Sequence, residues 1–149
     1  MINPEDKIPG AQNFQWWEAF VTDQLAYRQD NDINSRFSPI LFAEFLALPS
    51  HKQMEITNNI VAVGNKLQGA RDTMRRAIPI DSWFRSQRLN EMVGGEDDSF
   101  HLVAAAADPK LSQQALAIFV TYFNDINGGL GYSMRQAHID IGPRRRWPY

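Results

Sequence analysis

The sequence predicts an α+β fold, in which a helical N-terminal half packs on a small, mostly antiparallel sheet. Three observations support this class. Apolar residues between positions 14 and 74 recur mainly at helical spacing. After position 77 the apolar stretches become short, branched and aromatic, as in strands. Because helices come first and strands later, the order favours an α+β fold over a parallel sheet with alternating helices.

The composition is that of one globular domain spanning residues 1–149, with a helical part at 1–77 and a strand-rich part at 78–149. The chain has 149 residues, of which 44% are hydrophobic and 21% are charged, which excludes disordered and low-complexity classes. It contains no cysteine, which excludes disulfides, thiolate metal sites and a cysteine nucleophile. Any metal would therefore need histidine and carboxylate ligands, and only 3 histidines are present.

Charge and hydropathy give no indication of a nucleic-acid partner or of a membrane span. The formal net charge is -2 and the isoelectric point is about 5.9, so nothing indicates nucleic-acid binding. No apolar run approaches the ~20 residues that a membrane span requires. Residues 1–7 lack the basic start and the apolar core of a signal peptide, so we expect synthesis in the cytoplasm.

The N-terminal half is expected to hold three helices. Apolar and aromatic residues at 14–28 are spaced roughly as on a helix, and a polar break follows at 29–32. Ser38 and Pro39 suit the N-cap and the first position of a second helix, which ends at the next proline. The longest helix is expected from about residue 51 to residue 74.

The C-terminal half alternates short elements with turns. Its apolar residues change spacing repeatedly, and glycine, serine and proline separate the stretches. The expected elements are, in order, a strand at 77–84, a helix at 86–93, a strand at 102–107, a helix at 112–123 capped by Ser112, a turn at 127–129 and a strand at 137–141.

The residues that suggest chemistry lie in the last third of the chain. His101 and Asp108 are seven residues apart, and His138 lies in the last expected strand. Imidazole nitrogens and carboxylate oxygens are zinc ligands, and a catalytic zinc site uses three protein ligands with a fourth position left for water. The spacing alone leaves two interpretations, a metal site or a pair of hydrogen-bonded, half-buried histidines.

Residues 78–147 also contain a series of short motifs. They are Ser82-Trp83-Phe84-Arg85-Ser86, Leu89-Asn90, Val93-Gly94-Gly95, Ser99 with His101, Ala106 and Asp108, Gly128-Gly129-Leu130-Gly131-Tyr132, His138-Ile139-Asp140-Ile141-Gly142-Pro143, and Arg145-Arg146-Trp147. In order and spacing the series resembles the M15-type zinc D-Ala-D-Ala peptidases of the Hedgehog/DD-peptidase fold group. The resemblance implies a Hedgehog/DD-peptidase-like fold and is far more specific than any one motif.

The resemblance also implies which residues form the site. The implied ligands of one zinc ion per chain are His101, Asp108 and His138. Arg85 would bind a carboxylate of the substrate, for which a planar fork of donors is suited. Ser99 and Tyr132 complete the implied substrate-binding set, and Ser99 would also support His101.

The sequence departs from the family pattern close to this site. Trp83-Phe84 replaces Gly-Tyr and would be able to close the pocket. Ala104 replaces a glycine and adds a methyl group where the backbone is expected to approach the metal. Arg135 stands where several branches of the family carry an acid as general base. Asp140, on the same strand face as His138, is the remaining catalytic candidate, either to activate water or only to orient a ligand.

Two runs of like charge flank this region. Residues 96–98 are acidic and form either a solvated surface or a rim that disfavours anionic substrates. Residues 144–146 are basic and either pair with that acidic run or meet an anionic partner.

The resemblance implies a zinc-dependent D,D- or L,D-peptidase that acts on peptidoglycan stem peptides or cross-links. A small chain without a signal peptide resembles phage or prophage endolysins, which are made in the host cytoplasm and reach the cell wall after release. The alternative is a catalytically weak or inactive relative that keeps the fold, such as a virion or tail component whose partners are other phage proteins.

Overall fold

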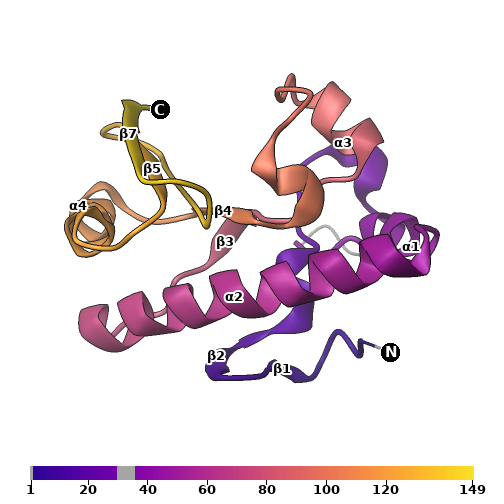
Figure 1. Ribbon diagram of the computed structural model, residues 1–149, viewed down its shortest axis with the longest axis horizontal. Helices are drawn as coiled ribbons and strands as arrows, with labels where there is room; N and C mark the ends of the chain where they lie inside the picture. The colour runs from indigo at the N-terminus through magenta and orange to yellow at the C-terminus, as the bar shows by residue number, and fades with distance from the viewer. Residues whose placement is uncertain (1, 30–35) are drawn as a thin grey trace.

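A long helix, α2 (Ser50–Met74), forms the centre of the computed structural model, which describes residues 2–29 and 36–149. Its buried face includes Ile60, Val63 and Leu67. Figure 1 shows the N-terminal hairpin on one side of α2 and the C-terminal strands and α4 (Gln113–Asn124) on the other. The helix expected at 51–74 is confirmed.

Serine side chains begin the other helices, as the sequence predicted for two of them. Ser38 accepts a hydrogen bond from the backbone N–H of Leu41 at the start of α1 (Pro39–Leu46). Ser112 caps α4 in the same way, and Ser86 caps α3 (Gln87–Met92). Each serine satisfies one of the backbone donors that a helix start leaves unpaired.

The prediction of a helix at residues 14–28 is wrong. The chain forms a hairpin of β1 (Lys7–Ile8) and β2 (Ala11–Gln15), then two short 3-10 helices, η1 (Trp16–Ala19) and η2 (Leu25–Tyr27). Gly10, with a φ of +78°, makes the hairpin turn. Tight 3-10 turns still bury aromatic side chains at close spacing, which imitates a helical pattern. The polar break at 29–32 falls largely outside the described residues.

A five-stranded sheet forms the C-terminal part, in the order β3-β4-β6-β5-β7. The strands are β3 (Ile80–Ser82), β4 (Ala106–Pro109), β5 (Gly129–Tyr132), β6 (Ala137–Asp140) and β7 (Arg145–Pro148). All neighbours pair antiparallel except β5 and β7, which are parallel. The α+β class with a mostly antiparallel sheet is confirmed.

The strand expected at 102–107 begins later than predicted. Residues Phe100–Val103 form a 3-10 helix, η3, which ends at Ala104 in the left-handed conformation with a φ of +57°. This explains the glycine that the family pattern carries there, because the left-handed conformation costs other residues about 1–2 kcal/mol. The methyl group of Ala104 lies fully buried in the apolar core.

One cluster of buried apolar side chains runs through both parts of the chain. The ring of Phe20 lies 5.1 Å from that of Phe45 and 5.8 Å from that of Phe84. Trp83 is also fully buried, so Trp83 and Phe84 fill the core instead of closing a pocket. Within the described residues, no helix is both long enough and apolar enough to cross a membrane.

Candidate metal centre

Three side chains that are distant in sequence converge beside the sheet. His101 lies on η3, Asp108 on β4 and His138 on β6. Strands β4 and β6 pair so that Ala106 is opposite Asp140, a register that brings Asp108 next to His138. One potential ligand atom from each of the three residues lies within 4.8 Å of the others. Both histidines are buried.

The backbone around His101 fixes which ring nitrogen carries the proton. Nδ1 lies 2.7 Å from the carbonyl oxygen of Trp83. A carbonyl can only accept, so Nδ1 donates and Nε2 keeps its lone pair in the neutral ring. Nε2 is buried without a hydrogen-bond donor among the described residues, and it lies 3.3 Å from Oδ1 of Asp108.

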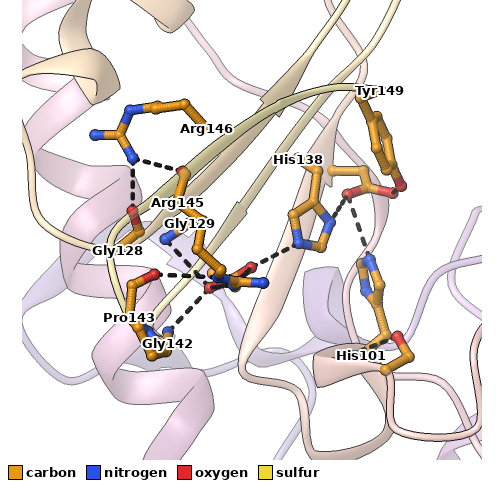
Figure 2. Close-up of polar contacts among 12 residues, drawn as sticks. His101, Gly128, Gly129, His138, Gly142, Pro143, Arg145, Arg146 and Tyr149 are labelled. Carbon is orange, nitrogen blue, oxygen red and sulfur yellow. Dashed lines mark hydrogen bonds and ion pairs between the residues drawn. The ribbon is translucent and has the colours of Figure 1, made fainter.

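The second histidine lies between two carboxylates. Nε2 of His138 lies 3.0 Å from Oδ2 of Asp140, and Nδ1 lies 2.9 Å from Oδ1 of Asp108. Figure 2 shows the ring of His138 with contacts on both of its nitrogens. Ionised Asp140 and ionised Asp108 can both only accept, so Nε2 donates to Asp140 and, without a metal, Nδ1 donates to Asp108. Burial lowers the pKa of His138, but its hydrogen bonds with the two carboxylates outweigh this and raise the pKa. A metal ion at Nδ1 would replace that proton, while Asp140 would keep the proton on Nε2.

Asp140 is held in place by several donors. Arg145 donates to both of its oxygens, at 2.8 and 2.7 Å, and the backbone N–H groups of Gly129 and Gly142 donate to Oδ1. Burial raises the pKa of Asp140, but the hydrogen bonds from His138 and Arg145 outweigh it and lower the pKa below its usual range. The Asp140 carboxylate is therefore a fixed acceptor for one nitrogen of His138, and Asp108 lies at the other nitrogen. The sequence left two roles open for Asp140, activating water or orienting a ligand. This geometry supports the orienting role.

The donor set fits a metal cation. Nε2 of His101 has no hydrogen-bond partner among the described residues, and it lies close to Oδ1 of Asp108, as does Nδ1 of His138. A cation bound by all three atoms would replace the proton that otherwise links His138 to Asp108. Burial raises the pKa of Asp108, yet the two histidines hold it well below its usual range, so the carboxylate is ionised. Two imidazoles and one carboxylate are a common ligand set of catalytic zinc. His101, Asp108 and His138 would hold such an ion.

Two hollows open on either side of this cluster. The first has a volume of about 320 Å³ and is lined by residues that include Asp108, Lys110 and Arg135. The second has a volume of about 420 Å³ and is lined by residues that include the two histidines, Glu96 and Asp98. Arg85 and Tyr149 line both hollows. Both hollows therefore adjoin the cluster.

Arg85 is fixed with one nitrogen directed at the cluster. Nε donates to Oγ of Ser82 at 3.1 Å and Nη1 donates to Oδ1 of Asn90 at 3.3 Å. Nη2 lies 3.8 Å from Oδ2 of Asp108, which is too long for a hydrogen bond. Ser82 and Asn90 thus position the guanidinium through Nε and Nη1, and the N–H groups of Nη2 remain available to a ligand.

The remaining predicted residues lie in different places. Ser99 caps η3 and accepts a hydrogen bond from the backbone N–H of His101, so it supports the backbone of that residue. Tyr132 is half-exposed and lines a separate apolar hollow, together with Leu116 of α4 and Met134, which follows β5. The structure brings Ser99 to the metal centre but does not bring Tyr132 there.

The basic run at 144–146 does not pair with the acidic run at 96–98. Arg144 and Arg146 donate to backbone carbonyls at the end of α4, including that of Ile126. Arg145 turns inward to Asp140 and lies between the rings of Phe100 and Trp147, with its guanidinium 5.2 and 5.0 Å from their centres.

Sequence reasoning missed Tyr149 altogether. Its hydroxyl donates to Oδ2 of Asp108 at 2.9 Å, and its ring centre lies 5.3 Å from that of His138. Burial and the Asp108 carboxylate raise the pKa of Tyr149 above its usual range, so the hydroxyl is protonated at neutral pH. No motif contains this residue. Only the parallel pairing of β7 with β5, which was not predicted, brings it to the site.

A family model described as Peptidase M15 matches residues 42–142. The chain belongs to the M15 peptidase family. No match is found among curated proteins. Members of this family depend on zinc, and the matched range contains all three candidate ligands as well as Arg85 and Asp140. The family therefore suggests a zinc peptidase whose substrate is a peptide. Tyr149 and Arg145 lie outside the matched range of this M15 peptidase.

Proposed function

We propose that this M15 peptidase uses zinc to hydrolyse peptidoglycan stem peptides or cross-links at bonds next to D-amino acids, as a D,D- or L,D-type enzyme. The observation that carries the proposal is the convergence of one ring nitrogen from each of two histidines on Oδ1 of Asp108. It lies within the range that matches the peptidase family. The peptidoglycan substrate is supported by the motif series that resembles the D-Ala-D-Ala peptidases.

The protein side chains around the cluster have distinct roles in this proposal. A zinc ion at such a site lowers the pKa of bound water to about 7 and polarises a carbonyl group. Asp140, held by Arg145, accepts from Nε2 of His138, so Nδ1 is the nitrogen that would bind the metal. Arg85 binds a substrate carboxylate through Nη2, while Ser82 and Asn90 fix its other nitrogens.

We infer that the proton acceptor is a carboxylate other than Asp140, because both oxygens of Asp140 already accept hydrogen bonds. Arg135 cannot accept a proton. Glu96 and Asp98 line the second hollow together with the two histidines, and both are exposed. We expect Glu96→Gln or Asp98→Asn to lower kcat by about 10²–10⁴-fold with the zinc content unchanged. If both variants keep their full kcat, the base lies elsewhere.

The test is hydrolysis of purified peptidoglycan, followed as release of new amine termini. His101→Ala and Asp108→Ala are expected to abolish the release, and a chelator is expected to do so reversibly, with recovery on adding zinc. His51→Ala is the matched control, because His51 is exposed on α2 and lies outside the metal centre. Hydrolysis that survives either ligand substitution would overturn the proposal.

We also propose an endolysin-like setting, in which the protein is made in the cytoplasm and acts on the cell wall after release. The support is the resemblance to phage or prophage lysis proteins. Expression inside a bacterium should leave cells intact until a separate pore-forming protein is co-expressed. Lysis without the pore would contradict this setting.

A second candidate is a protein that keeps the fold and the metal but does not hydrolyse peptides, such as a virion or tail component. Arg135 at the expected base position and the full engagement of Asp140 favour it. Zinc would then stabilise the fold. This candidate predicts that the protein sediments with peptidoglycan or with other virion proteins and releases no amines.

A further inference from the structure

Tyr149 reaches the metal centre from beyond the end of β7. Its backbone N–H donates to the carbonyl of Tyr132 at 3.0 Å, which fixes the main chain against β5. Its hydroxyl then points inward and donates to Oδ2 of Asp108 at 2.9 Å. Figure 2 shows Tyr149 above the space between His101 and His138. The side chain thus combines an exposed face with a hydroxyl in contact with a candidate ligand.

The two oxygens of Asp108 have different surroundings. Oδ1 faces both histidines, at 3.3 Å from Nε2 of His101 and 2.9 Å from Nδ1 of His138. Oδ2 faces away from them and receives the hydroxyl of Tyr149, with Nη2 of Arg85 at 3.8 Å. A donor on one oxygen of a carboxylate occupies the lone pair that would otherwise bind the metal as a second ligand atom.

We propose that Tyr149 is a positioning residue. Its hydroxyl restricts Asp108 to a single ligand oxygen and keeps Arg85 from pairing with the other oxygen, so that Arg85 remains available to the substrate. Without the hydroxyl, Oδ2 would be free to join the metal and to attract the guanidinium of Arg85. Both changes would alter the site: the metal would gain a ligand, and Arg85 would lose its orientation toward a substrate carboxylate. The inference rests on the zinc and substrate roles of the proposed function.

The experiment compares Tyr149→Phe with the wild type and with Tyr122→Phe. Phenylalanine removes one oxygen and keeps the ring, so the fold is expected to remain intact, which far-ultraviolet circular dichroism checks. Tyr122 lies on α4 against Gly69 and away from the metal centre, which makes it the matched control. The probes are Co²⁺ in place of zinc, a chelator that competes for zinc, and a peptide with either a free C-terminal carboxylate or an amide.

Tyr149→Phe is expected to weaken the visible absorption of the cobalt protein, because an extra ligand oxygen raises the coordination number. The dissociation constant for zinc is expected to change by several-fold, because the set of oxygens available to the ion changes. KM is expected to rise several-fold for the free carboxylate and to stay unchanged for the amide. Tyr122→Phe should match the wild type in every measurement.

The outcomes separate this inference from the proposed function. If the wild type binds neither zinc nor cobalt, the proposed function fails and the inference falls with it. If the wild type binds both and Tyr149→Phe has the same spectrum and zinc affinity, only the inference is overturned. A variant with lower KM for both peptides would also overturn it, since Tyr149 would then be an obstruction.

Discussion

The protonation of two imidazoles decides what the cluster can hold. The Trp83 carbonyl fixes the proton of His101 on Nδ1, and Asp140 fixes that of His138 on Nε2. The other nitrogen of each ring faces Oδ1 of Asp108. The chain therefore prepares a cation site through neighbours that do not themselves touch the cation.

Substitution of Asp140 tests whether this residue orients His138. Asp140→Asn would no longer hold the Nε2 proton of His138 with a charged acceptor and would leave Arg145 without its partner. We expect zinc affinity to fall by about 10–100-fold, with activity partly restored at high zinc. Competition with a chelator measures the affinity. An unchanged affinity together with a large loss of kcat would instead identify Asp140 as the base.

The sequence pointed to the three candidate ligands through the resemblance of its motif series to the M15-type peptidases, because the spacing of the histidines and the aspartate alone left two interpretations open. It could not separate the two roles of Asp140, since these depend on which oxygens are occupied. It could not find Tyr149, because no pattern links that residue to a site built by η3, β4 and β6.

Among the elements, those with a local start signal were predicted best. Ser38 and Ser112 begin helices where the sequence placed them, because a serine cap acts within three residues. The region at 14–28 failed, since its aromatic residues are buried by a hairpin and 3-10 turns that periodicity alone does not distinguish from a helix. Strands β5 and β7 are glycine- and arginine-rich, and only their partners in the sheet make them strands.

The C-terminal end of α4 depends on an arginine from β7. Arg146 donates to the carbonyls of Ile126 and Gly128 at 2.9 and 2.7 Å. Arg146→Met should lower the free energy of unfolding by about 1–3 kcal/mol. This corresponds to a fall in melting temperature of about 3–10 °C by calorimetry. The exposed Arg76→Met is the control, and an equal effect of both variants would contradict the capping role.

Glu18 on η1 gives the fold a pH dependence. Burial raises its pKa from the ordinary value of 4.5, although the N–H of Gln15 partly opposes this. The folded state therefore binds the proton more tightly than the unfolded state. The resulting stabilisation is present below pH 4.5 and is lost as the pH rises through the folded pKa.

Melting temperatures of the wild type and Glu18→Gln measured from about pH 3.5 to pH 7 test this dependence. The variant should gain stability relative to the wild type as the pH rises, because glutamine keeps the acceptor and carries no charge. Titration of the other groups is common to both proteins and cancels in the difference. A difference that stays constant with pH would contradict the assignment.

At the scale of the whole molecule, the metal centre joins segments that the chain places far apart. Its three residues come from η3, β4 and β6, and η3 also packs against α2. A ligand bound only by the folded state stabilises it, by about 2.7 kcal/mol at a concentration 100 times its dissociation constant. Zinc should therefore raise the melting temperature of the wild type, and His138→Ala should abolish the increase.

The most direct test of the account is the metal content of the purified protein, measured by mass spectrometry without exposure to chelator. We expect about one zinc per chain in the wild type and in His51→Ala, and none in His138→Ala or Asp108→Ala. No bound metal in the wild type, even after zinc is offered at neutral pH, would contradict the assignment of His101, Asp108 and His138 as a zinc site.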